Sequence, residues 1–238
     1  MGVPANGPAF TPGGLDSEAI MTGIVDYVSL QAAIVEYLAR DQDTTLIARI
    51  PSFIQFAEAK FNRQLFVRQM EQRSTAVVNL LSSEPEFIAL PSDFQSMRRV
   101  RLSSVTGKPC LEFKSGTQMD EYRFATFDVV AQPRYFTVFG SEIELAPTPD
   151  AAYTIEMVYR QVIPPLATGN TNWLLTIAPD LYLYGALLES APYIKEDARI
   201  TTWGTAFASA LDDLNDLGKV STFNAGPMVI RPSGINTW

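Results

Sequence analysis

The sequence predicts an α+β fold: an α-helical bundle of about four main helices, with an antiparallel β-rich region inserted between the second and third helices. Apolar residues recur at helical spacing near both ends of the chain, whereas residues 70–165 contain the short alternating runs that are typical of strands. We therefore expect an N-terminal arm at 1–25, helices within 26–69 and 172–217, the β-rich insert at 70–165, and a C-terminal arm at 218–238.

The first predicted helix, residues 26–40, follows an arm rich in Gly, Pro and Ala that has no periodicity. Its apolar residues fall on one stripe: Tyr27, Leu30, Ile34, Tyr37 and Leu38.

The second predicted helix is "IPSFIQFAEAKFNRQL", with Pro51 in the first turn, where proline is well tolerated. Its apolar face consists of Ile54, Ala57, Phe61 and Leu65. The charged residues Glu58, Lys60 and Arg63 are expected off this face.

The β-rich insert is predicted from three segments. "YFTVFGSEIEL" reads as a hairpin, because Gly140 supplies the positive φ that a type II′ turn needs. "YTIEMVYR" alternates apolar and polar residues. In "MRRVRL", Val100 and Leu102 share a face with Arg98, while Met97, Arg99 and Arg101 take the other. These patterns indicate an antiparallel sheet with one buried face.

The third predicted helix, from Pro179 to Ala191, is apolar nearly all round and should end at Pro192. The last helix is expected from about Asp197 to Leu217, with Gly218 as its stop. This helical part has four aromatic anchors: Trp173, Tyr182, Tyr184 and Trp203. Few elements are available to cover a helix that is apolar on every side. Two roles therefore stay open for these anchors, core packing and core packing combined with contact to another copy.

Composition excludes several classes of function. The chain has a net charge of −8 and no histidine, so a catalytic Ser-His-Asp or Cys-His site and an ordinary zinc site are excluded. One cysteine, Cys110, cannot form an intrachain disulfide and lacks a histidine to activate it. The most apolar long stretch, residues 170–194, contains Asp180, Glu189 and two prolines, so no membrane span is expected. No cofactor motif is present.

Two groups of carboxylates are candidate catalytic or metal sites. Glu142 and Glu144 share a strand face, as a two-carboxylate hydrolase would require. Three aspartates lie opposite the apolar stripe of the last helix: Asp212, Asp213 and Asp216. A solvated face is the favoured interpretation of both groups.

The densest basic stretch, "MRRVR", is a possible charged contact face through Arg99 and Arg101. Nucleic acid, an acidic partner and a neighbouring subunit are the candidate contacts, and an exposed solubilising face is the alternative. Acidic composition elsewhere argues against sequence-specific DNA binding.

Most of the chain, residues 44–217, resembles the phage head–tail adaptor family, the connector or tail tubular ring proteins below the portal. The segments that carry the likeness include "FIALPSDFQSMRRVRL", "IELAPTPDAAYTIEMVYRQVIPPL" and "NTNWLLTIAPDLYLYGALLESAPYIKEDARITTWGTAFASALDDLN". The resemblance implies a ring of identical subunits, a dodecamer to match the portal, around a channel for the genome. It also implies that "STFNAGPMVIRP" docks into the portal protein through Phe223, Met228, Val229, Ile230 and Arg231.

We therefore expect a structural virion protein of the head–tail neck, assembled in the host cytoplasm, and not an enzyme. It joins portal to tail or nozzle protein, closes the head after packaging, and lets genomic DNA pass without sequence-specific binding. Two alternatives stay open, a histidine-free carboxylate hydrolase and a monomeric protein-binding module.

Overall fold

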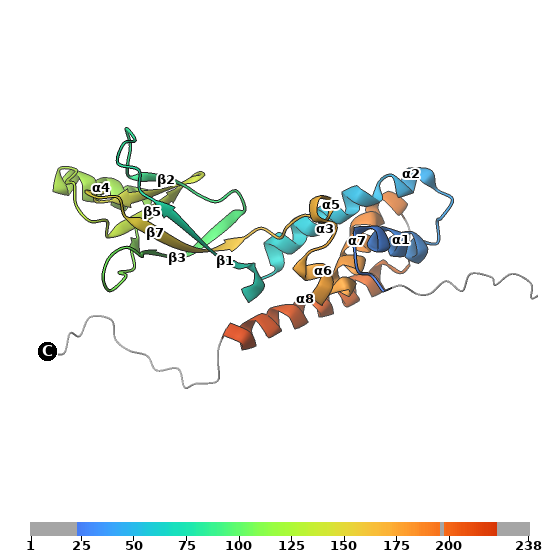
Figure 1. The fold of residues 1–238 in the computed structure, drawn as a ribbon. Helices are drawn as coiled ribbons and strands as arrows, with labels where there is room; N and C mark the ends of the chain where they lie inside the picture. The colour runs from blue at the N-terminus through green and yellow to red at the C-terminus, as the bar shows by residue number, and fades with distance from the viewer. Residues whose placement is uncertain (1–22, 196–197, 223–238) are drawn as a thin grey trace, which may run out of the picture.

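The computed structural model describes residues 23–195 and 198–222, and it shows a helical lobe and a β lobe lying end to end (Figure 1). The α+β prediction is confirmed. The elements, in chain order, are α1 (Tyr27–Leu38), α2 (Thr44–Ile47), α3 (Ile50–Gln64), η1 (Arg68–Met70), β1 (Glu71–Val77), β2 (Phe87–Ala89), β3 (Phe94–Leu102), β4 (Glu112–Phe113), α4 (Gly116–Thr126), β5 (Tyr135–Phe139), β6 (Glu142–Ala146), β7 (Thr154–Gln161), α5 (Leu166–Gly169), α6 (Trp173–Ile177), α7 (Pro179–Ile194) and α8 (Ile200–Thr222).

The helical lobe is built around α7, which packs against α1, α3, α6 and α8. These neighbours explain why α7 is apolar nearly all round, because a helix with buried faces on several sides needs apolar residues on each. The predicted apolar faces of α1 and α3 point into the same core, with Leu30, Ile34, Ala57 and Phe61 fully buried. Tyr37, at the edge of the α1 stripe, is 45% exposed instead.

Two predicted helix ends are wrong. Helix α7 continues past Pro192 to Ile194, since its last turn is closed by a hydrogen bond from the Lys195 N–H to the Ala191 carbonyl (3.0 Å). Helix α8 continues past Gly218 to Thr222. A Cβ at Gly218 would lie 3.1 Å from the Phe66 carbonyl oxygen, so the glycine allows close packing rather than ending the helix. The expected arm at 218–238 therefore begins inside α8.

The β lobe contains two sheets, where the sequence pattern indicated one. The first has the strand order β1-β7-β3 and the second β2-β6-β5-β4. Their apolar faces share one core, to which Val100, Ile155 and Met157 contribute from the first sheet and Ile143 and Leu145 from the second. The predicted β5–β6 hairpin is present, with Gly140 at φ +60°.

Three features of the β lobe differ from the sequence expectation. Met97 packs against the shared core rather than facing outward with Arg99, because a register shift between these two residues moves them to opposite faces. Strand β4 pairs parallel to β5. Helix α4 was not predicted, although Ser115 and Gln118 form a capping box at its start.

The junction between the lobes is fixed by Asn62, in the last turn of α3. Its side-chain Oδ1 accepts a hydrogen bond from the Ile163 N–H (2.8 Å), on the segment that returns from the β lobe. Its backbone carbonyl accepts hydrogen bonds from Gln95 Nε2 (2.7 Å) and from the Arg160 guanidinium (3.0 Å). One residue therefore holds two strands and the returning chain.

Helix α8 also braces this junction. Asn215 Oδ1 accepts a hydrogen bond from the Phe66 N–H (2.8 Å), and Asn215 Nδ2 donates to the Gln64 carbonyl (3.3 Å). The Arg160 guanidinium lies 4.3 Å from the centre of the Phe66 ring, within cation–π range. Helix α8 and strand β7 therefore both contact the outgoing chain at Phe66.

We expect opposite effects from alanine at two helical glycines. A Cβ at Gly185 would lie 2.8 Å from the Phe61 ring, which Tyr182 and Phe207 contact, so Gly185→Ala should destabilise the protein by about 1–3 kcal/mol. At Gly204 the nearest atom is 3.9 Å away, so Gly204→Ala should stabilise it by about 0.5–1 kcal/mol. Urea unfolding measures both, and equal effects of the two variants would contradict the close α3–α7 contact.

Candidate assembly surfaces

The four aromatic anchors divide into two pairs. Tyr182 is fully buried and Trp203 is 5% exposed, so both lie in the core of their own chain. Trp173 and Tyr184 are partly buried at the edge of that core. Contact with another copy stays a prediction, and only the partly buried pair leaves surface available for it.

Glu58 is buried, although the helix pattern placed it off the apolar face of α3. Its Oε1 accepts hydrogen bonds from the Leu166 N–H (2.8 Å) and the Tyr182 hydroxyl (3.4 Å), and Asn172 Nδ2 donates to the same hydroxyl (2.7 Å). Pro165 precedes α5 and has no side-chain hydrogen bond to offer, so Glu58 caps α5 from the neighbouring helix. Burial raises the pKa of Glu58 despite these hydrogen bonds.

A cavity of about 390 Å³ lies beside Glu58, between α1, α3 and α5. Its lining contains no carboxylate other than Glu58; the lining residues are Tyr27, Pro51, Ser52, Ile54, Gln55, Glu58, Pro165, Ala167 and Thr168. A two-carboxylate hydrolase needs a second acid at this point. Glu58, whose pKa is raised by burial, therefore has no partner of that kind in its cavity.

The other candidate carboxylates, on β6 and α8, do not converge either. Glu144 is paired with Arg123, while Glu142 is exposed. The three aspartates of α8 are exposed, with Asp216 paired to Lys219 (2.8 Å). In the part of the chain that the structure describes, no group of three or more Asp, Glu, Cys or His is arranged to hold a metal ion. Cys110 is exposed and bridges to Arg101 through the backbone.

Arginines surround a buried glutamate on the outer face of the β1-β7-β3 sheet. Glu156, only 2% exposed, lies 2.6 Å from Arg101 Nη2 and 3.1 Å from Arg73 Nε. The hydrogen bond from Arg101 lowers the pKa of Glu156. Arg98 pairs with Glu71 (2.9 Å) at the edge of this surface, and Arg99 is exposed. We call Arg73, Arg98, Arg99 and Arg101 the arginine face.

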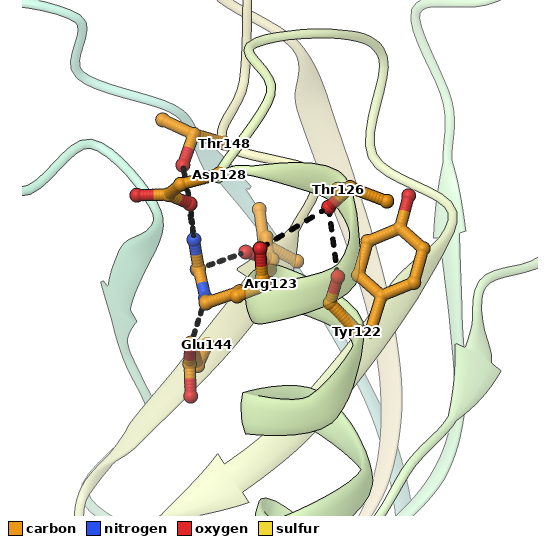
Figure 2. A network of polar contacts seen from close by, with 7 residues as sticks. Tyr122, Arg123, Thr126, Asp128, Glu144 and Thr148 are labelled. Atoms are coloured by element: carbon orange, nitrogen blue, oxygen red, sulfur yellow. Dashed lines mark hydrogen bonds and ion pairs between the residues drawn. The ribbon is translucent and has the colours of Figure 1, made fainter.

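A second polar network fixes the far end of the β lobe (Figure 2). Arg123 of α4 donates hydrogen bonds to Glu144 Oε1 (2.8 Å) and to the Leu145 carbonyl (2.9 Å), and it also pairs with Asp128. This clamp holds α4 against the β5–β6 hairpin and leaves two large apolar side chains in solvent. Phe124 is 87% and Phe127 93% exposed.

Sequence reasoning missed Glu58 and Arg123. The capping box at Ser115 was the available signal for α4 and so for Arg123, whereas the helical pattern gives no sign that α5 and α7 cover Glu58. The proposed docking residues Phe223, Met228, Val229, Ile230 and Arg231 lie outside the described residues, beyond the end of α8 at Thr222.

Removing the Glu58 charge should flatten the pH dependence of stability. Because the pKa of Glu58 is raised in the folded state, the unfolded chain releases this proton first. The free energy of unfolding should therefore fall as pH rises from about the ordinary value of 4.5 through the raised folded pKa. Glu58→Gln keeps the acceptor oxygen and should remove that fall.

Urea unfolding at several pH values between about 4 and 8 measures this effect. Glu36→Gln, at an exposed position of α1, is the matched control and should leave the pH profile of the wild type unchanged. Parallel profiles for the wild type and Glu58→Gln would contradict the burial of a titrating Glu58.

Arg123→Met should destabilise the protein by about 2–4 kcal/mol, because it leaves Glu144 without its partner in a partly buried site. Arg134→Met, at an exposed position before β5, should change stability by less than about 0.5 kcal/mol. Unfolding followed by circular dichroism gives both values. Similar small losses would show that the clamp contributes little.

No curated protein matches the chain. None of the described helices combines the length and apolarity needed to cross a membrane. Residues 25–231 match the family described as SU10 adaptor protein, a family of the phage head–tail adaptor type. This match covers well over half of the sequence, and the chain therefore belongs to the SU10 adaptor protein family.

Proposed function

We propose that this phage adaptor forms a ring in the neck of the virion, where it joins the portal to the tail, continues the DNA channel and closes the head after packaging. The observation that carries the proposal is the adaptor-family match over residues 25–231. A structural role also fits the distribution of polar groups, since Glu58 and Glu144 have internal partners and are used for packing.

A closed ring needs two different surfaces on each subunit, one for each neighbour. The two lobes supply surfaces of different chemistry. The β lobe presents the arginine face, and the helical lobe presents an acidic face on α8, formed by Asp212, Asp213 and Asp216. Partly buried Trp173 and Tyr184 are further candidates for subunit contact.

A net charge of −8 suits a channel that lets DNA slide, because like charges repel the duplex and do not retain it. Binding through phosphates would require an uncompensated basic surface. The arginine face contains Glu156 and borders Glu71, which reduces its excess of positive charge. DNA is therefore proposed as a passing cargo without sequence-specific contacts.

Residues 223–238 are proposed to dock into the portal through Phe223, Met228, Val229, Ile230 and Arg231. Apolar anchors in the sequence that follows α8 suit binding to a groove on a partner. Tail or nozzle proteins are the proposed partners on the other side of the ring. In this scheme the folded lobes form the ring, and the C-terminal segment attaches it.

The mass of portal rings mixed with the adaptor tests the proposal. Full-length chain should add the mass of a ring, and a chain ending at Thr222 should not, because it keeps all of α8 but lacks the docking residues. A chain that lacks residues 1–22 is the matched control for removing a terminal segment, and it should still add.

Addition by the Thr222 truncation would retain the ring but reject C-terminal docking. Addition of single copies, or of none, by the full-length chain would reject the ring and return the monomeric binding module as the better interpretation.

A further inference from the structure

We propose that the arginine face of one copy binds the acidic face of α8 on the next copy, and that this pairing is a head-to-tail contact of the ring. The inference rests on the proposed ring and specifies which surfaces meet. It commits the arginine face to a second copy of this chain as its partner.

The arginine face is open to a partner. In the described part of the chain, no helix makes a substantial contact with β1, β3 or β7, and α4 packs on β5 of the other sheet instead. The side chains of Arg73 and Arg98 are 66% and 58% exposed. The arginine face has four arginines and two carboxylates, those of Glu71 and Glu156, so the surface keeps an excess of positive charge.

Several of these arginines are already oriented. Glu156 holds Arg73 and Arg101, and Glu71 holds Arg98. A guanidinium that is fixed by one carboxylate still has free N–H donors and loses less conformational entropy when a second carboxylate binds. Each can therefore pair with a carboxylate on a partner at a small entropic cost.

The acidic face supplies matching carboxylates. Asp212, Asp213 and Asp216 are exposed on α8, and Lys219 pairs with only one of them. Asp212 and Asp216 also line a groove of about 610 Å³ that contains Phe66, whose exposed fraction is 67%. The groove offers apolar surface beside the charges, which suits a partner protein better than a solvated ion.

The two faces belong to different lobes, so their contact joins unlike surfaces. A contact between unlike surfaces repeats from copy to copy and closes into a ring or continues as a filament, unlike a two-fold dimer contact. Charge pairing at such an interface sets partner choice, register and association rate more than final affinity.

Cysteine crosslinking on portal rings tests this contact. Two variants are made in a Cys110→Ser background, one with Arg99→Cys and one with Asp213→Cys, all at exposed positions. Their equimolar mixture should give a disulfide-linked dimer after mild oxidation with copper–phenanthroline, whereas neither variant alone should. Glu36→Cys in place of Asp213→Cys is the matched control and should give at least tenfold less dimer.

A charge exchange gives an independent readout of the same contact. Asp212→Arg/Asp213→Arg should slow ring formation at least tenfold at low salt, and adding Arg73→Asp/Arg99→Asp to the same chain should restore the rate.

Rings that form with no crosslink above the Glu36→Cys control, or with unchanged rates, would overturn the inference and leave the ring intact. Absence of rings from the wild type would overturn both. Retention of duplex DNA by the wild type but not by Arg99→Glu would assign the face to nucleic acid and overturn the pairing.

Discussion

The hydrogen bonds that Asn62 accepts join the two lobes where the chain leaves the helical lobe and where it returns to it. Its side chain binds the returning segment at Ile163, and its carbonyl binds Gln95 of β3 and Arg160 of β7. If the segments that connect the lobes were not held in this way, the lobes would move relative to each other here, because connections between lobes carry few buried contacts. The Asn62 hydrogen bonds, with the brace from Asn215 of α8, hold both crossings to the end of α3. The orientation of every outer surface on one lobe relative to the other depends on these contacts.

A fixed orientation matters because the proposed role is mechanical. Subunits of a ring must repeat one geometry, and a heterologous contact closes only if the rotation between neighbours is constant. The buried polar groups serve this purpose within each lobe. Glu58 caps α5 from α3, and Arg123 fixes α4 to the β5–β6 hairpin. Charged surfaces are left outside, with basic groups on the sheet and acidic groups on α8, where they can meet another copy.

Local periodicity was enough to predict the α+β class, the α3 face, the β5–β6 hairpin and the apolar character of α7, since each depends on residues close in sequence. It failed where a distant segment decides the outcome. The local sequence predicts a solvent-facing Glu58, but α5 and α7 cover it in the structure. It also predicts a helix stop at Gly218, but this glycine lies within α8, where it packs closely against Phe66. Met97 changes face at a register shift that no alternation pattern reveals. The basic stretch "MRRVR" is evident in the sequence, but Glu156, the buried partner of Arg101, comes from another strand.

A reconstruction by electron cryo-microscopy of portal rings incubated with the full-length chain tests the central claim most directly. The account predicts a closed ring of adaptor subunits, each with its two lobes in the same relative orientation, the arginine face against the neighbouring α8, and residues 223–238 extending into the portal. Portal rings that carry isolated, differently oriented copies, or that carry none, would contradict it.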